Sequence, residues 1–414
     1  MAFKQVGQQG GPLEGVRVVD FTRVLAGPHC TKHLLDLGAE VIKIEPPQGD
    51  ITRLAFPRRD EISGYYAQQN AGKRNLSIDL NVPEARQVVL QLCDTADIIV
   101  ENFRPGALTS FGLDYQSVAA RNPAVVYASI SGYGQNGPWR TRMAYAPTVQ
   151  AEVGFTYNTL QQFGVEGAAR RSDSLSHGDV YAGLHATIAV LAALQHRRLT
   201  GEGQYIDVAM AAVLTSVNER VHYDLSDVDL GAETPILGAT DCAFFTSPEG
   251  HDFVSPMSLV GSLGFPLYLH AMRRPDLADD PRFRTPELRK QNLEVLHAIV
   301  QNWIYTFDSM GALDAQFDEA KIATGQLRDM TEFNETDWAK GWVTTREVSD
   351  RHGGTITIPA PPWHFSGHDG TLTTQVPARQ GEHNEEILKE LGLTNDEIDA
   401  LINSGALIEP AVRP

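Results

Sequence analysis

The chain has 414 residues, 42% of them apolar, so it is long enough to form two domains with a substantial core. Its 34 basic and 52 acidic residues give a net charge of −18, which argues against a nucleic-acid or anionic-membrane surface. Cys30, Cys93 and Cys242 lie far apart without CxxC spacing, so we expect no disulfide scaffold, no thiolate zinc site and a reducing, cytoplasmic environment. No stretch approaches the roughly 20 apolar residues of a membrane span.

Short apolar runs typical of buried strands alternate with helical stretches over the first part of the chain. The expected strands cover 16–21, 41–45, 97–103 and 125–131, and helices are expected around 30–40, 83–96 and 105–122. This alternation predicts an α/β fold with a parallel, doubly wound sheet. Ligands of such sheets bind beyond the carboxyl ends of the strands, where we expect the turns at Arg23, Asn102 and Tyr133.

A long apolar helix is expected from Val180 to Gly201, which is placed to end it. Its apolar residues fall at three- and four-residue steps: Leu184, Ile188, Leu191 and Leu194. Asp179 then lies at or near the helix N-terminus, where unpaired backbone N–H groups and the helix dipole favour an anion. The commonest role of an acidic residue at that position is a cap. A carboxylate can also act as a nucleophile, so this segment leaves both roles open.

The second half of the chain begins with a strand expected over 204–210 and a helix over 211–225. An acidic, glycine-bearing stretch follows and is typical of a linker. A mixed domain is expected next, with a pair of short apolar runs and a helix around 292–305. We therefore divide the chain into a large domain over 1–225, a linker and small domain over 226–337, and a C-terminal segment over 338–414.

Two glycine-bearing motifs resemble nucleotide-binding signatures but are incomplete. Residues 132–137, GYGQNG, have the spacing of a dinucleotide fingerprint, but Pro138 follows and no helix is expected to open there. Residues 70–75, NAGKRN, lack the upstream glycine and the hydroxyl residue of a P-loop. Lys73 and Arg74 therefore remain candidates for phosphate contacts, but a P-loop nucleotide site is excluded.

The histidine spacing does not indicate a metal site. His29 and His33 sit four residues apart, as do His364 and His368, but no third ligand is evident near either pair. We therefore expect packing or surface histidines and no bound metal. The GxSxG motif of a hydrolase nucleophile is absent. Basic residues lie instead around the expected strand ends: Arg23, Lys73, Arg74, Arg104 and Arg142.

Seven blocks of sequence follow one another in a fixed order along the chain. They read GPLEGVRVVDFTRVLAGP, LGAEVIKIEPPQGD, NAGKRNLSIDL, ADIIVENFRPGAL, YASISGYGQNGP, GDVYAGLHATIAVLAAL and TGEGQYIDVAM. Together they resemble the class III CoA-transferases, the formyl-CoA transferase family, which also includes carnitine CoA-transferases and α-methylacyl-CoA racemases. The tail, GEHNEEILKELGLTNDEIDALINSGAL, is similar to the family's C-terminal pair of helices. The resemblance runs from about Gly11 to Ile408 and is densest up to Met210.

The resemblance implies a large Rossmann-like domain, a smaller α+β domain, a C-terminal segment that returns to the large domain, and an interlocked homodimer. It implies a coenzyme A thioester as substrate, a carboxylic acid as acceptor and no tightly bound cofactor. It places a nucleophile at Asp179 and an active-site tyrosine at Tyr145, with His177 and Gly178 beside Asp179 in the substrate pocket. The implied CoA contacts are Arg23, Val24, Leu25, Ala26, Ile78, Asp79, Leu80, Asn81, Asn102, Phe103 and Arg104, with Lys73, Arg74 and Arg142 as further candidates for the phosphates.

Three features depart from the family pattern. Pro46 and Met143 stand where the formyl-CoA enzyme has basic residues that contact CoA phosphates. The glycine-rich loop over the formyl-CoA active site is not evident, and residues 256–264 are the nearest candidate. Tyr145 and Ala146 stand where the racemases carry a His-Asp pair, so one partner of a two-base proton shuttle is missing.

We therefore expect a CoA-transferase in which Asp179 forms an acyl anhydride and then an aspartyl-CoA thioester. A 2-methylacyl-CoA racemase or epimerase is the first alternative, and a non-catalytic CoA-thioester-binding protein is the second. Arg170 and Arg171 precede Asp179 and are either a solvated surface pair or partners for a second carboxylate of the acceptor. The sequence does not identify the acyl group or the acceptor acid.

Overall fold

The structure is a computed structural model that describes residues 11–59, 62–159, 175–219, 221–226, 242–367 and 376–408. The chain divides into two compact units. The first unit comprises Met1–Val221 and Gly341–Pro414, and the second comprises His222–Lys340.

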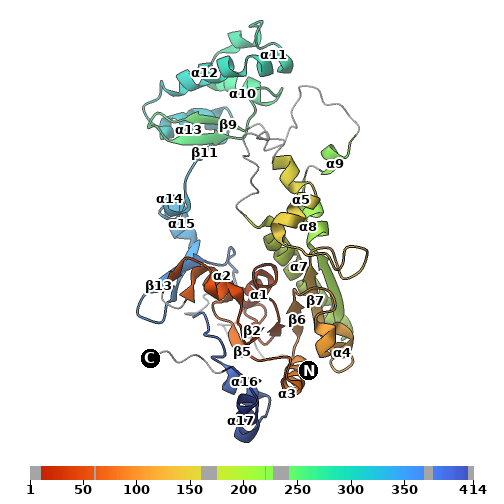
Figure 1. Ribbon diagram of the computed structural model, residues 1–414. Coiled ribbons are helices and arrows are strands. Elements are labelled where there is room, and N and C mark those ends of the chain that lie inside the picture. The colour runs from red at the N-terminus through yellow and green to blue at the C-terminus, as the bar shows by residue number, and fades with distance from the viewer. Residues whose placement is uncertain are drawn as a thin grey trace. The chain divides into compact units, whose positions relative to one another are not determined.

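A six-stranded parallel sheet forms the centre of the first unit (Figure 1). Its strands, in spatial order, are β5 (Arg74–Ser77), β2 (Glu40–Glu45), β1 (Arg17–Asp20), β6 (Ile98–Glu101), β7 (Val126–Ser131) and β8 (Gln204–Ala209). Every neighbouring pair is parallel, which confirms the predicted α/β fold with a parallel sheet. The chain crosses in opposite directions from β1, so the ends of β1 and β6 form the switch point at which doubly wound sheets bind ligands.

Helices cover both faces of this sheet, because successive strand residues point to opposite sides. Val18 and Val100 pack on the first face, and Val19 and Ile99 pack on the second. The first face is covered by α1 (Ala26–Asp36), α5 (Ala146–Glu152), α7 (His177–Thr200) and α8 (Met210–Val217). The second is covered by α3 (Pro83–Asp94), α4 (Tyr115–Ala119), α16 (Asn384–Glu390) and α17 (Asn395–Asn403).

Helices α1 and α7 pack closely and run parallel. A Cβ atom on Gly183 would lie 2.6 Å from the backbone oxygen of Ala26 and 3.0 Å from the Cβ atom of His29. One turn later, the Thr187 hydroxyl lies 3.5 Å from the backbone oxygen of Cys30. Residue numbers increase in the same direction in α1 and in α7 along this contact, which shows that the two helices run parallel. Only glycine at position 183 permits this approach.

The C-terminal part of the first unit covers the β5 edge of the sheet. The Asn384 side chain accepts a hydrogen bond from the Ser77 amide (2.8 Å) and donates one to the backbone oxygen of Ile408 (2.8 Å). Ile78 also forms an antiparallel bridge with Leu407. A hairpin of β12 (Thr345–Ser349) and β13 (Thr355–Pro359) packs against α2 (Gly64–Asn70).

The second unit contains a three-stranded antiparallel sheet in the order β11 (Gly325–Gln326), β10 (Asp252–Ser255), β9 (Ala243–Thr246). Strands β9 and β10 are the pair of short apolar runs expected from the sequence. Its main helices are α10 (Gly264–Met272), α12 (Leu293–Ile304) and α13 (Met310–Glu319), and Phe253, Tyr268 and Phe317 lie in its core. The expected helix around 292–305 is α12.

The remaining elements of the chain are short. They are η1 (Ile51–Leu54), β3 (Arg58–Arg59), β4 (Ile62–Ser63), η2 (Leu108–Phe111), α9 (Val221–Asp224), η4 (Pro275–Ala278), α11 (Pro286–Gln291), α14 (Met330–Asn334) and α15 (Asp337–Trp342). No helix in the described ranges is both long enough and apolar enough to cross a membrane.

Two expected helices are interrupted. The stretch from 105 to 122 forms only η2 and α4, because Gly112 between them has φ of +69° and Asp114 caps a new helix. The helix expected over 211–225 ends at Val217, since Asn218 is extended with ψ of 96°. Neither interruption changes the sheet.

Candidate active site

Asp179 is the third residue of α7, as the sequence predicted. It does not serve as the side-chain cap of that helix. The Gly178 amide instead donates to Oε1 of Gln150 on α5 (3.2 Å). Among the described residues, none of the hydrogen bonds or ion pairs involves the Asp179 carboxylate. Asp179 therefore does not have the capping role that the sequence left open, and Gln150 instead accepts from an amide at this helix end.

The Asp179 carboxyl is half-buried, and this burial raises its pKa from 3.8 to about 6. Removing a carboxylate from water disfavours its charged form unless a cation or donor compensates. At neutral pH the group is still mostly ionised, because pH 7 lies above that pKa. A poorly solvated carboxylate without a stabilising partner has the properties of a nucleophile.

The N-terminus of α1 faces the same region as Asp179. Gly183 touches Ala26 at the start of α1, and Asp179 lies one helical turn (about 6 Å) before Gly183 on the same side of α7. In the described part of the chain, the backbone N–H groups of Leu25, Ala26 and Gly27 have no acceptor. The positive ends of two parallel helix dipoles therefore meet near this carboxylate.

The turn after β1 is held by Asn102 at the end of β6. The Asn102 side chain accepts a hydrogen bond from the Arg23 amide (2.9 Å) and donates one to the Arg23 carbonyl (2.9 Å). The Arg23 guanidinium lies 5.3 Å from the centre of the Phe103 ring. Val24 has φ of +66°, which is unusual for a β-branched residue. The structure thus brings together the predicted CoA-binding residues of these two turns at the switch point.

The turn after β5 lies at the same carboxyl edge of the sheet. Ile78 is buried, Asp79 donates its amide to the Ala406 carbonyl (2.8 Å), and Leu80 packs against the second core. Asn81 is exposed and donates both its amide and its side chain to the Asp79 carboxylate. Arg104, after β6, is also exposed. Of these predicted CoA contacts, Asn81 and Arg104 are the exposed ones, so their side chains are the most accessible to a ligand.

Lys73 and Arg74 do not lie with those exposed groups. The Lys73 ammonium is buried and pairs with Asp20 (3.0 Å), and it donates to the Thr31 hydroxyl (2.7 Å). Burial lowers the Lys73 pKa to about 8. Arg74 begins β5, at the opposite edge of the sheet, and pairs with Glu40 (2.5 Å) and Glu390 (2.8 Å). The prediction that these two cations contact CoA finds no support in this placement.

Arg142 also has partners within the protein. Its guanidinium forms an ion pair with Glu152 and lies 4.7 Å from the centre of the Trp139 ring. The ring of Tyr133 lies 5.6 Å away on the same cation. A contact between Arg142 and a CoA phosphate would have to compete with Glu152.

The expected substrate-pocket residues meet where α5 and α7 begin. A Cβ atom on Gly178 would lie 2.8 Å from the sulfur of Met210 and 3.4 Å from Cα of Ala146. Tyr145 directly precedes Ala146 and is 62% exposed. The His177 ring lies 5.8 Å from the Tyr181 ring and stacks on it. Tyr145, His177 and Gly178 therefore border the N-terminus that carries Asp179.

Tyr65 is a neighbour of Asp179 that the sequence analysis missed. Burial raises the pKa of the Tyr65 phenol, and the negative charge of Asp179 raises it further. Tyr65 lies on α2, whose pairing with the Asp179 region is a long-range contact. Gln150 was missed for the same reason. The only local signal is helical spacing, which puts Tyr65 on the same face of α2 as Gln69.

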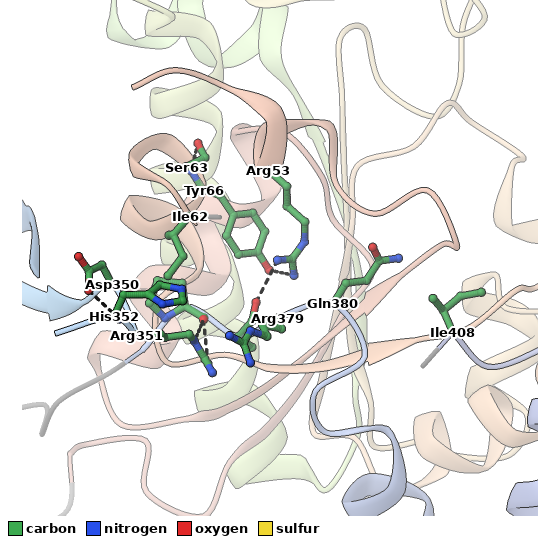
Figure 2. Close-up of a pocket in the computed structure, with 12 residues that line it drawn as sticks. Arg53, Ile62, Ser63, Tyr66, Asp350, Arg351, His352, Arg379, Gln380 and Ile408 are labelled. Atoms are coloured by element: carbon green, nitrogen blue, oxygen red, sulfur yellow. Dashed lines mark hydrogen bonds between the residues drawn. The ribbon is translucent and has the colours of Figure 1, made fainter. Parts of the chain in front are cut away.

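A separate cavity of about 170 Å³ is lined by residues of the segment after β2, of α2 and of the C-terminal part of the first unit (Figure 2). Arg53 and Tyr66 meet in it, and the Tyr66 hydroxyl accepts from Arg53 at 2.6 Å. Arg351, Arg379 and Gln380 line its other side. Asp179 does not line this cavity.

The described residues contain no group of three or more His, Cys, Asp or Glu side chains that could hold a metal ion. His29 and His33 contact each other through their Nε2 atoms (3.2 Å). Burial lowers the pKa of His33 to about 3, so this pair stays neutral and serves packing. His368 lies outside the described residues, so the expectation that it is a packing or surface histidine stays a prediction.

Residues 13–384, most of the chain, match CoA-transferase family III. The chain belongs to this family. It is 32% identical to the formyl-CoA:oxalate CoA-transferase of Streptomyces coelicolor, over 95% of this chain and 99% of the relative. It is 33% identical to the succinyl-CoA:mesaconate CoA-transferase of Haloarcula hispanica, over 92% and 97% of the two chains. A solved CAIB/BAIF family protein from Brucella suis is similar in fold, with a TM-score of 0.74, 28% identity, and coverage of 92% and 100%.

Membership of CoA-transferase family III confirms the resemblance seen in the sequence blocks. Its named relatives are transferases that act on acyl-CoA thioesters. The sites described above, the β1 and β6 turns and the start of α7, all lie within the matched residues.

Proposed function

We propose that this protein transfers CoA from an acyl-CoA thioester to a carboxylic acid, with Asp179 as the nucleophile. One observation carries the proposal: a half-buried carboxylate without a described partner lies where the N-termini of α1 and α7 meet. That position adjoins the switch-point turns of the sheet, which suits a thioester whose CoA portion extends along the carboxyl edge.

In the first step, an Asp179 oxygen attacks the thioester carbonyl carbon. The C–S bond breaks, which gives a mixed anhydride on Asp179 and a CoA thiolate. The thiolate then attacks the carbonyl carbon of the Asp179 side chain. The bond from that carbon to the bridging oxygen breaks, so the donor acid leaves as a carboxylate and an aspartyl-CoA thioester remains.

The acceptor reverses the sequence. Its carboxylate attacks the aspartyl thioester and expels CoA thiolate, which gives a second mixed anhydride. The thiolate attacks the acceptor carbonyl, the new acyl-CoA leaves, and Asp179 returns as a carboxylate. No net proton is taken up or released. Each attack places negative charge on a carbonyl oxygen, for which the amides of Leu25, Ala26 and Gly27 are the available donors.

We propose a dicarboxylic acid as the acceptor. Oxalate and mesaconate, which appear in the names of two relatives, are both dicarboxylates. Arg170 and Arg171 lie outside the described residues, so the role considered for them stays a prediction.

We also propose the family's interlocked homodimer, with a large domain, a small domain and a returning C-terminal segment, as its working form. Sedimentation of the full chain measures the assembly directly. A monomer that is fully active at its sedimentation concentration contradicts the proposed dimer.

The function is tested by incubation with acyl-CoA donors and mono- or dicarboxylate acceptors, followed by product analysis and intact mass. We expect transfer, a protein adduct of acyl or CoA mass that hydroxylamine removes, and loss of both in Asp179→Ala by at least about a thousandfold. Exchange of the donor's α-hydrogen with deuterated solvent, without transfer, would instead indicate a racemase. Binding of CoA thioesters without adduct or exchange would indicate a non-catalytic protein.

A further inference from the structure

Two buried charges lie directly behind the turn that follows β1. Lys43 on β2 and Asp50 in the loop after β2 are 0% and 3% exposed, and their charged atoms are 3.3 Å apart. The Lys43 ammonium donates to the backbone oxygen of Thr22 (2.6 Å). The Asp50 carboxylate accepts from the backbone N–H of Val24 (3.2 Å). The pair therefore holds the backbone on both sides of Arg23.

This pair completes the hydrogen bonding of the turn. The Asn102 side chain bonds to the N–H and the carbonyl of Arg23, so Asn102, Lys43 and Asp50 together satisfy four backbone groups between Thr22 and Val24. Val24 has φ of +66°, where a β-branched side chain is strained. Such a conformation persists only when the surrounding structure enforces it. Asp50 is the described acceptor of the strained residue's own N–H group.

Asp50 is itself fixed from several directions. Its carboxylate accepts from the amide (3.0 Å) and the hydroxyl (2.8 Å) of Thr52, and its amide donates to Glu45 (3.1 Å). Glu45 in turn pairs with Arg53 (2.8 Å), which contacts Tyr66 as Figure 2 shows. A side chain held by so many bonds can impose its geometry on the turn instead of following it.

The turn that this pair holds leads directly into the unpaired amides of α1. Val24 sets the direction in which the N–H groups of Leu25, Ala26 and Gly27 point, because they follow it within three residues. A small misplacement of such donors relative to a reacting carbonyl costs much of their effect.

We propose that Lys43 and Asp50 are positioning residues that force Val24 into its left-handed conformation. They thereby aim the α1 amides at the oxygen of the carbonyl group that reacts, either that of the substrate or that of the Asp179 side chain. This inference rests on the proposed transferase function. It adds two residues that do not touch the substrate but decide how well the turn stabilises the transition state.

The test compares Asp50→Asn and Lys43→Met with wild type in full-length protein, using the donor and acceptor pair that gives the fastest transfer. We expect kcat to fall at least about tenfold while the dissociation constant for CoA changes less than about threefold, because the oxyanion exists only during the reaction. Lys32→Met is the matched control, since Lys32 also forms a buried ion pair, with Asp36 on α1, and has no hydrogen bond to the turn. We expect the control to lose stability without this fall in kcat.

A second substitution separates positioning from simple loss of structure. Glycine adopts positive φ without the strain of a side chain, whereas alanine does not. Val24→Gly added to Asp50→Asn should therefore raise kcat at least about threefold, and Val24→Ala should not. If Asp50→Asn does not fold, the same pair of substitutions is made in Lys43→Met.

The outcomes are distinct for the two proposals. The proposed function is overturned if the wild-type protein transfers no CoA with any of the donor and acceptor pairs tested. Active wild type with kcat within twofold in both Asp50→Asn and Lys43→Met overturns the positioning role. Equal falls in kcat for these variants and Lys32→Met, or equal response to Val24→Gly and Val24→Ala, also overturn it.

Discussion

Asp179 and Asp20 are both carboxylates removed from water in the same unit, but their surroundings differ. Burial alone raises the pKa of Asp20, yet Lys73, Lys43 and the hydroxyls of Thr22 and Thr31 outweigh it and hold the pKa at about 2. Burial raises the pKa of Asp179 to about 6, and no described cation opposes it. The charged and hydroxyl partners of Asp20 therefore account for the opposite directions of the two pKa shifts.

The difference has an energetic consequence. Asp20 and Lys73 stabilise each other, so the folded protein depends on both. Asp179 is charged at neutral pH in a place that disfavours charge, so its burial lowers the stability of the fold, and the proposed function gives a reason for this cost. Each of the following substitutions or measurements tests one side of this contrast.

The largest effect on stability is expected from Lys73→Met. It leaves Asp20 buried without its main partner, and loss of one member of a buried pair destabilises by about 3–5 kcal/mol. Chemical denaturation measures the change. Arg121→Met is the control, because the Arg121–Asp94 pair is exposed to solvent and should contribute little to stability. Similar changes in the two variants would contradict the structural role of Asp20.

Asp179→Ala is expected to be inactive yet more stable than wild type at high pH. The folded pKa of about 6 lies above the unfolded value near 3.8, so wild-type stability falls as pH rises between them and stays reduced above pH 6. The variant lacks this loss, and we expect an advantage on the order of 2 kcal/mol at pH 8 that disappears near pH 4. Denaturation at both pH values measures it. A difference between the two proteins that does not vary with pH contradicts the raised pKa.

The pH dependence of kcat/KM should report the same Asp179 pKa as the stability measurements. Only the ionised Asp179 attacks a thioester, so kcat/KM should rise with pH through about 6 and level off above it. Below that value we expect about a tenfold fall per pH unit. Initial rates between pH 4.5 and 8 measure the profile, with stability checked at each pH. A profile that stays flat down to pH 4.5 would place the reactive group elsewhere.

The sequence predicted the parts of the molecule that depend on local pattern. Apolar runs indicated β1, β2, β6 and β7, and the spacing of apolar residues placed Asp179 at the start of α7. Strand alternation then put Arg23 and Asn102 at one edge of the sheet, where the structure joins them by hydrogen bonds. These features follow from periodicity and topology, which a single sequence records.

The features that the sequence did not reveal depend on contacts between distant residues. Lys73 was predicted as a candidate for a phosphate contact, but it pairs with Asp20, which lies 53 positions earlier in the chain. Lys43 lies in a strand whose two faces are both covered, so its burial has no local signal. The positive φ of Val24 was equally hidden, because its residue type argues against that conformation. Tertiary partners produced each of these outcomes.

The smallest expected effect is a change in the KM for acyl-CoA, and it distinguishes Arg104 from Arg74, which were both predicted to contact CoA. Arg104 is exposed beyond β6, whereas Arg74 is paired with Glu40 and Glu390 at the other edge of the sheet. Arg104→Met should raise the KM for acyl-CoA about three- to tenfold at low salt and less at high salt, because an exposed phosphate contact is screened. Arg74→Met is its matched control and should leave that KM within about twofold while lowering stability slightly. An equal rise in the KM for Arg74→Met and Arg104→Met would show that the ion pairs of Arg74 do not prevent it from binding CoA. The presence of partners within the protein would then separate structural from ligand-binding groups for carboxylates but not for cations.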